Sequence, residues 1–215
     1  MESVLTKSPL FSGLEPGDLD FALAFFNGRK KHHKAGEFLQ HAGAPVEKFG
    51  LLLSGSVQVC MTDLEGSRMI MVTVSPGDTF GESLCFLNSP DSPVYIQAVQ
   101  DSELLWMDTG RLRQGAKCPR EQDMVNRFTG LLARRALSMN DRIQILSKPT
   151  LRQKINTLFA EQMRRTGSPV FTLPFDREGM ASYLGADRSA LSRELSRMKR
   201  EGLIDYYKSS FRILD

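Results

Sequence analysis

The class of the C-terminal third is decided by one stretch, Asp176-Arg177-Glu178-Gly179-Met180-Ala181-Ser182-Tyr183-Leu184-Gly185-Ala186-Asp187-Arg188-Ser189-Ala190-Leu191-Ser192-Arg193. Asp176 and Asp187 can each cap the start of a helix, and Gly185 can end the first helix in the left-handed conformation. Apolar residues recur at i, i+4 and i+7 along the second helix and face inward: Leu191, Leu195 and Met198. Two short helices joined by a glycine turn predict a helix-turn-helix, whose second helix enters the DNA major groove.

The outward positions of the second helix carry arginines and hydroxyls. Arginine can donate two hydrogen bonds to guanine O6 and N7, and a hydroxyl adjusts to a base or a phosphate. We expect base contacts from Arg188, Ser189, Ser192 and Arg193. We expect phosphate contacts from Arg197, Lys199 and Lys208.

The end of the chain predicts a small β-hairpin beside these helices. Residues 203–207 and 211–214 are rich in apolar and aromatic side chains and flank Lys208-Ser209-Ser210. A helix pair alone is a weak signal. The helix pair, the hairpin wing and the basic outward face together are a strong signal for DNA binding.

Charge is unevenly distributed along the chain. Residues 1–110 hold 7 Lys and Arg against 14 Asp and Glu, whereas residues 111–215 hold 21 against 11, so the net charges are −7 and +10. Such a split indicates a nucleic-acid or membrane surface, although solvated helices also carry many Lys and Arg. It becomes informative because the basic part also contains the helix-turn-helix pattern.

Short apolar runs alternate with glycine-containing turns between Arg29 and Asp108. The runs are 37–41, 49–53, 57–61 and 69–74. Short strands at this spacing predict a closed sandwich or barrel. Asp63-Leu64-Glu65-Gly66 is typical of a hairpin loop in which glycine supplies the positive φ.

A long helix is predicted between Glu121 and Leu146. Its apolar positions step by three or four residues: Val125, Phe128, Leu132, Ala136, Met139, Ile143 and Leu146. Such a narrow seam is typical of a helix that pairs with a second helix. We favour a homodimer interface at Val125, Phe128, Leu132, Ala136, Met139 and Ile143 over a seam that covers the chain's own β domain.

These patterns divide the chain into three predicted segments. Residues 1–115 form a β domain, residues 116–148 the long helix, and residues 149–215 the helix-turn-helix domain. No apolar run approaches the roughly 20 residues of a membrane helix. The N-terminus lacks a secretory pattern, and three widely spaced cysteines favour a reducing compartment. We therefore expect a cytoplasmic protein without a membrane partner.

The chain resembles the CRP/FNR family of bacterial transcription regulators along nearly its whole length. The motifs, in order, are residues 10–14, the strand-and-glycine pattern through Gly55, Pro76-Gly77-Asp78-Thr79-Phe80-Gly81-Glu82, the long helix and residues 183–193. The resemblance implies an α+β fold with an N-terminal β-roll (a double-stranded β-helix of the cyclic-nucleotide-binding type), a dimerisation helix and a C-terminal winged helix-turn-helix. It implies a homodimer on a pseudo-palindromic operator of double-stranded DNA. RNA polymerase is a further expected partner, and no enzymatic activity is expected.

The same resemblance places an effector pocket in the β-roll. Cyclic-AMP-binding members hold the ribose with Gly and Glu at the positions of Gly81 and Glu82, and the phosphate with an Arg-Ser or Arg-Thr pair. Ser92 and Pro93 stand at that pair here, and residues 82–94 contain no Lys or Arg. A desolvated phosphate needs a positive charge. The candidate pocket residues are Gly81, Glu82, Ser83, Ser92, Pro93 and Val94, and the small-molecule effector is expected not to be cyclic AMP.

The resemblance also marks two departures. Family members usually carry an acid at the position of Ser189, whereas Ser192-Arg193 is similar to the FNR branch. The family's iron–sulfur members carry an N-terminal cysteine cluster, and this chain has no cysteine before Cys60. An altered half-site and the absence of that cofactor are therefore expected.

Three alternatives stay open on the sequence. His32, His33 and His41 could bind a metal or haem, but the surrounding run of Lys and Arg favours a solvated basic stretch and no metal site. Cys85 could sense oxidation, although a buried structural thiol is more common. The rival functions are a cupin-like metal enzyme on the same β-roll, and a nucleotide-binding module that does not bind DNA.

Overall fold

The computed structural model describes residues 2–62, 68–173 and 175–214. The chain divides within its longest helix into two compact units, residues 1–134 and 135–215. The predicted segment boundaries near residues 115 and 148 flank that helix, and as domain limits they stay predictions. The predicted hairpin loop at residues 63–66 lies outside the described residues.

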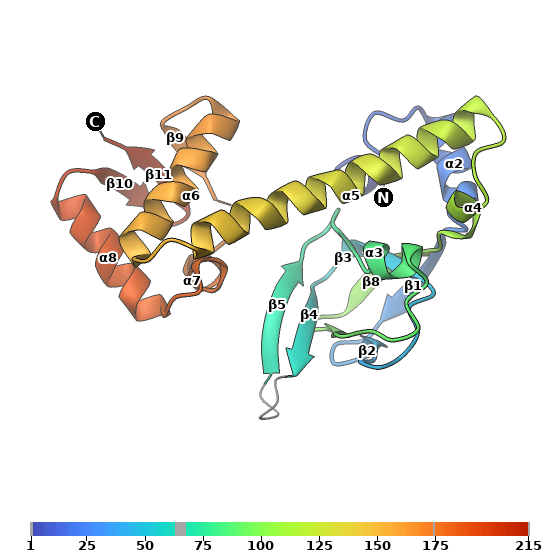
Figure 1. The fold of residues 1–215 in the computed structure, drawn as a ribbon, viewed down its shortest axis with the longest axis horizontal. Coiled ribbons are helices and arrows are strands. Elements are labelled where there is room, and N and C mark those ends of the chain that lie inside the picture. The colour runs from blue at the N-terminus through green and yellow to red at the C-terminus, as the bar shows by residue number, and fades with distance from the viewer. Residues whose placement is uncertain (1, 63–67, 174, 215) are drawn as a thin grey trace. The chain divides into compact units, whose positions relative to one another are not determined.

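The first unit is built on two four-stranded antiparallel sheets (Figure 1). One sheet has the order β1 (Arg29–His33), β8 (Ser102–Met107), β3 (Phe49–Ser54), β6 (Thr79–Phe80). The other has the order β2 (Phe38–Gln40), β7 (Tyr95–Ala98), β4 (Val57–Thr62), β5 (Arg68–Val74). The predicted β-roll of short strands is confirmed.

Both sheets contribute side chains to the interior of the roll. The buried cluster there consists of Leu52, Val57, Val74, Phe80, Ile96 and Leu104. Phe80 lies directly over Gly50, where an added Cβ atom would come within 2.2 Å of the ring carbon Cζ. Glycine is therefore required at position 50, because any side chain would displace the Phe80 ring.

Helices cover the outer face of the β1-β8-β3-β6 sheet. They are α1 (Glu2–Leu5), α2 (Pro16–Phe25), α3 (Glu82–Phe86), α4 (Gly110–Arg113) and the start of α5 (Pro119–Leu146). Phe26 makes ring contacts with Phe11, Phe49 and Phe128, at centroid distances of 6.0 to 6.4 Å. The pattern of the sequence predicted α5, whereas α1, α3 and α4 are too short to show periodicity.

The apolar seam of α5 divides into two parts. Phe128 is buried in the core of the first unit, and Val125 and Leu132 pack against that core. In contrast, Met139 and Ile143 are 65% and 62% exposed. The first half of the seam therefore covers the chain's own β domain, and the apolar side chains exposed further along α5 are Ala136, Leu137, Met139, Ile143 and Leu146.

The second unit contains the predicted winged helix-turn-helix. After the end of α5 it consists of α6 (Leu151–Thr166), β9 (Val170–Thr172), α7 (Arg177–Leu184), α8 (Arg188–Arg200), β10 (Ile204–Tyr207) and β11 (Ser210–Ile213). Gly185 ends α7 with a φ of 58°. The predicted hairpin is confirmed, and β9 pairs with β11 as a third strand that the sequence did not predict.

Buried apolar residues hold α8 against α6 and α7. Leu191, Leu195 and Met198 are buried as their spacing predicted, and they share a core with Ile155, Leu158 and Leu184. The phenylalanines of α6, β9 and β11 pack beside them, with Phe159 and Phe211 at a centroid distance of 4.8 Å. One face of α8 is thereby fixed toward the core.

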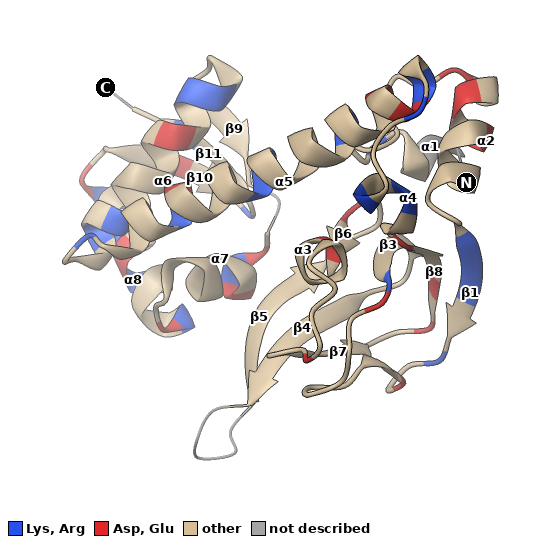
Figure 2. Cartoon of the chain, turned by 45° about the vertical axis from the view of Figure 1, so that its right-hand side comes forward, with Lys and Arg blue, Asp and Glu red and all other residues tan. Residues whose placement is uncertain are grey.

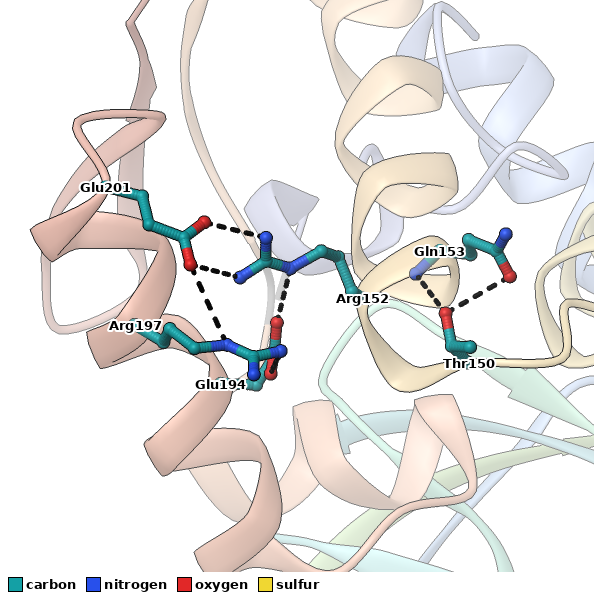
Figure 3. A network of polar contacts seen from close by, with 6 residues as sticks. All are labelled: Thr150, Arg152, Gln153, Glu194, Arg197 and Glu201. Atoms are coloured by element: carbon teal, nitrogen blue, oxygen red, sulfur yellow. Dashed lines mark hydrogen bonds and ion pairs between the residues drawn. The ribbon is translucent and has the colours of Figure 1, made fainter.

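A network of ion pairs joins α6 to α8 on the surface of this unit (Figure 3). The Arg152 guanidinium donates to Glu194 at 2.6 Å and to Glu201 at 2.7 Å. Arg197 contacts the same two carboxylates, at 2.6 and 3.9 Å. Two guanidinium groups and two carboxylates therefore share one cluster, a geometry more favourable than an isolated surface pair.

The network changes the ionisation of its carboxylates. Burial by itself would raise the pKa of Glu194, but hydrogen bonds from Arg152 and Arg197 lower this pKa below its ordinary value of 4.5. The hydrogen bond from Arg152 also lowers the pKa of Glu201. A carboxylate with a lowered pKa stabilises the folded state above its ordinary pKa, and this contribution is lost as the pH falls through the lowered value.

We predict that Arg152→Met lowers the thermal midpoint of the second unit at neutral pH. The difference from the wild type shrinks as the pH falls from 4.5 through the lowered pKa values of Glu194 and Glu201, because the carboxylates of both proteins then become protonated. Circular dichroism melts at neutral pH and at a pH well below 4.5 measure this. Arg165→Met, which removes a charge from the same helix but none of these contacts, is the control. An equal difference at both pH values would contradict the role of the network.

Candidate nucleic-acid interface

The start of α8 is fixed by one carboxylate. Oδ1 of Asp187 accepts hydrogen bonds from the backbone N–H groups of Ser189 and Ala190, each at 2.9 Å. These are two of the orphan donors at a helix N-terminus. The hydrogen bond from the Ser189 hydroxyl and those from the backbone lower the pKa of Asp187, so the cap is ionised at neutral pH.

The predicted base-contacting side chains lie on the outer face of α8. Arg188, Ser189 and Arg193 are exposed, and Ser192 is half-buried. Their opposite face is the buried one, since it carries the leucines that pack on α6 and α7. A helix with this orientation can present its arginines to a groove of a nucleic acid.

An open groove of about 670 Å³ follows this helix. Its lining includes Ser192, Arg193 and Arg197, which the sequence had singled out, and also Ser196 and Arg200. Arg200 lies two helical turns after Arg193 and is exposed. Ser196 and Arg200 were not among the predicted contacts, although the outward spacing of α8 continued beyond Arg193 reaches both.

Hydrogen bonds connect several of the candidate residues. The Ser189 hydroxyl donates to Oδ1 of Asp187 at 2.5 Å and accepts from Nη1 of Arg193 at 3.1 Å. The Ser192 hydroxyl instead donates to the backbone carbonyl of Arg188 at 2.9 Å. The Ser189 hydroxyl therefore makes hydrogen bonds to two side chains, whereas the Ser192 hydroxyl makes one to the helix backbone.

Two of the predicted phosphate contacts are already paired with carboxylates. Arg197 belongs to the network with Glu194 and Glu201. Lys199 contacts Asp205 at 2.5 Å, and this contact raises the pKa of Lys199. A phosphate would have to compete with these carboxylates, so each cation adds less to a DNA contact than an unpaired one would.

The third predicted phosphate contact lies at the tip of the wing. Lys208 adopts a positive φ of 53° in the turn between β10 and β11, and it is exposed. Its ammonium group lies 5.5 Å from the ring centroid of Tyr207, which is 75% exposed. The wing therefore ends in an exposed cation beside an exposed aromatic ring.

Basic side chains occur on both units. Figure 2 shows Lys and Arg on β1 and along α8. On β1, Arg29, Lys30 and Lys31 are exposed at the edge of a sheet. Exposed lysines on an edge strand prevent pairing with other chains, which accounts for this stretch without a ligand.

The candidate effector residues lie at two places in the β-roll. Gly81 has a φ of 78° and precedes α3, whose first residue Glu82 is buried. Val94 packs on the interior cluster that contains Phe80, next to Gly81 in the chain. Of these residues, Val94 packs on the apolar interior of the roll, whereas Glu82 begins α3, which packs on the outer face of the sheet. Ser83 and Pro93 are exposed.

The position expected to hold a phosphate has different chemistry here. The Ser92 side chain is buried, and its hydroxyl donates to the Val94 carbonyl at 2.6 Å. The same oxygen accepts from the Val94 N–H at 3.3 Å. The Ser92 hydroxyl therefore makes both of these hydrogen bonds within its own turn. Arg113 donates to the carbonyl of Cys85 at 3.1 Å and to the Thr109 hydroxyl at 2.7 Å.

The three histidines are not equivalent. His33 is buried, with Nδ1 2.7 Å from Glu37 and Nε2 accepting from the Trp106 indole N–H at 3.0 Å. His32 and His41 are exposed. Both ring nitrogens of His33 are thus engaged by protein groups, and no lone pair is available for a metal or haem iron.

The cysteines also differ in environment. Cys85 is buried, and its thiol donates to the Glu47 carbonyl at 3.2 Å. Burial raises the pKa of Cys85, which disfavours the reactive thiolate. Cys85 is therefore a structural thiol, whereas Cys118 is exposed.

Two family models match the chain, one over the β-roll of the first unit and one over the helix-turn-helix of the second unit. A cyclic nucleotide-binding domain matches residues 30–117, and a Crp-like helix-turn-helix domain matches residues 151–215. The first match covers the β-roll and the second covers α6 to the wing. No helix among the described residues is both long and apolar enough to cross a membrane.

Several known proteins are similar to this chain. The cyclic AMP receptor protein of Thermus thermophilus is 27% identical over 197 residues, covering 92% of this chain and 88% of that protein. The transcriptional activator protein FnrL of Cereibacter sphaeroides is 39% identical over 69 residues, 28% of either chain. The structure of the c-di-GMP-responsive regulator CLP of Xanthomonas campestris has a TM-score of 0.63 at 17% identity, covering 94% of this chain and all of that one.

These relatives are transcription regulators rather than enzymes, and CRP-like regulators bind DNA and act as dimers. A β-roll, a long helix and a winged helix-turn-helix with an exposed basic face occur together in this chain. The chain belongs to the CRP/FNR family of DNA-binding transcription regulators.

Proposed function

We propose that the outer face of α8 recognises a pseudo-palindromic operator, with Arg188 and Arg193 at the bases. The orientation of α8 carries this proposal, because its leucines are buried and Arg188 and Arg193 are exposed. Phosphates are expected to be neutralised by Arg197 and Arg200, which line the groove along α8, and by Lys208 at the tip of the wing. Such a regulator acts where the bacterial chromosome lies, in the cytoplasm.

Arg193 is expected to read a base, whereas Arg197 contributes less. Operator DNA is first selected from random-sequence duplexes with the purified protein. Arg193→Ala should then weaken binding to the selected duplex by about 1–3 kcal/mol, measured by fluorescence anisotropy, with a smaller effect on unrelated DNA.

Arg197→Ala is the matched control for Arg193→Ala. The Arg197 guanidinium is paired with Glu194 and Glu201, so its removal should lower the DNA affinity less than Arg193→Ala does and should do so equally for all sequences. Failure to enrich any sequence would refute specific recognition. Unchanged affinity of Arg193→Ala would refute the assigned role of Arg193.

We also propose that the exposed part of α5 pairs two copies of the chain. Met139, Ile143 and Leu137 are 62% to 65% exposed, an unusual state for large apolar side chains on one helix. A two-fold pair of reading helices would match a pseudo-palindromic operator. Recruitment of RNA polymerase is a further step of this proposal and rests on family membership alone.

Ile143→Asp should weaken the dimer, because the seam would bury an unpaired carboxylate. Sedimentation equilibrium should show the dimer dissociation constant raised at least about tenfold. Ser138→Asp is the control, since position 138 lies about 140° around the helix from position 143. A dimer unaffected by Ile143→Asp would place the interface elsewhere.

We propose further that the β-roll senses a small-molecule effector other than cyclic AMP. Two observations support this. The Ser92 hydroxyl both donates to and accepts from the Val94 backbone, and residues 82–94 of the sequence contain no Lys or Arg. The relatives respond to different molecules, since one is named for cyclic AMP and another for c-di-GMP. Family membership therefore does not fix the effector.

Cyclic AMP and cyclic GMP should leave the stability of the first unit unchanged. A ligand that binds only the folded state raises its thermal midpoint by mass action. Trp106 is the one tryptophan of the sequence and lies in the β-roll, so its fluorescence reports on this unit alone. A midpoint that rises with nucleotide concentration would refute the proposal, and native mass spectrometry of the protein from its source would then reveal any retained molecule.

A further inference from the structure

The environment of Ser189 fixes the direction of its hydrogen bonds. Its hydroxyl has one proton, and that proton is donated to Oδ1 of Asp187 at 2.5 Å. Asp187 is ionised at neutral pH and also caps the helix through two backbone N–H groups. The carboxylate can only accept, so the Ser189 oxygen can only accept from any other group.

Arg193 uses this oxygen. Its Nη1 donates to the Ser189 hydroxyl at 3.1 Å, one helical turn along the exposed face. An exposed arginine otherwise samples many rotamers, and ordering one such side chain costs about 0.5–1.5 kcal/mol on binding. A hydrogen bond present before binding removes part of that cost.

We infer that Asp187 and Ser189 are positioning residues that aim the Arg193 guanidinium at a guanine of the operator. The inference rests on the proposed function, because it takes Arg193 as the base-contacting arginine. Ser189 acts through Arg193 and does not need to touch a base itself. The cap of α8 thereby serves two purposes, since the same carboxylate starts the helix and orders its reading side chain.

The other serine of this face provides a matched control. The Ser192 hydroxyl donates to the carbonyl of Arg188 and makes no hydrogen bond to a side chain of the described residues. Ser192→Ala and Ser189→Ala remove the same atom from the same exposed helix. Only Ser189→Ala breaks the chain from Asp187 to Arg193.

The experiment measures discrimination at the guanine that Arg193 contacts. Random-sequence duplexes are first enriched with the wild-type protein, and each enriched guanine is then replaced by 7-deazaguanine, which lacks the N7 acceptor. The guanine whose replacement no longer affects Arg193→Ala is the one that Arg193 contacts. Ser189→Ala should reduce the discrimination at this guanine by about threefold to tenfold, which corresponds to the free-energy cost of ordering one side chain on binding.

Three further variants separate positioning from other roles. Ser189→Thr keeps the hydroxyl and should retain discrimination, and Ser192→Ala should not lower it at this guanine. In an Arg193→Ala background, Ser189→Ala should have no additional effect on it. A further loss in that background would instead mean direct base contact by Ser189 and would overturn the inference.

The outcomes also distinguish this inference from the proposed function. No enriched sequence for the wild type would refute the proposed function. An enriched operator that Ser189→Ala recognises with unchanged discrimination would refute only the positioning role. Circular dichroism tests the fold of each variant, and the backbone bonds from residues 189 and 190 to Asp187 should preserve α8 when the hydroxyl is removed.

Discussion

The burial of one face of α8 is the constraint on which the reading surface depends. Leu191, Leu195 and Met198 are almost completely buried against α6 and α7, and removing such side chains typically costs several kcal/mol. Rotating the helix to hide its arginines would expose these residues to water. The exposure of Arg188 and Arg193 is therefore a consequence of the packing of the core.

Electrostatic contacts refine what the packing exposes. Arg197 and Lys199 are paired with carboxylates, whereas Arg193 is hydrogen-bonded to a neutral hydroxyl. Non-specific attraction to DNA grows with every phosphate that a cation neutralises. Partial neutralisation of the flanking cations reduces this sequence-independent attraction, and leaves a larger share of the binding energy to side chains that distinguish bases.

The β-roll has kept its architecture while the chemistry of its expected ligand site has changed. The Phe80 ring lies over Gly50, and Glu82 at the start of α3 is buried. Ser92 and Pro93 stand where the resemblance predicts a phosphate-binding pair, and the Ser92 hydroxyl makes its hydrogen bonds within its own turn. A shared fold therefore does not by itself fix the ligand that it binds.

The order of residues alone determined the elements that depend on local periodicity and capping. Asp176, Gly185 and Asp187 mark the helix-turn-helix to the residue, because caps and glycine turns act within a few positions. The tertiary structure decided what depends on distant neighbours: the burial of Phe128 in its own unit, the strand β9 and the pairing of Arg197. A seam of apolar residues specifies that a helix face will be covered, but the partner that covers it is set by which surfaces meet in three dimensions.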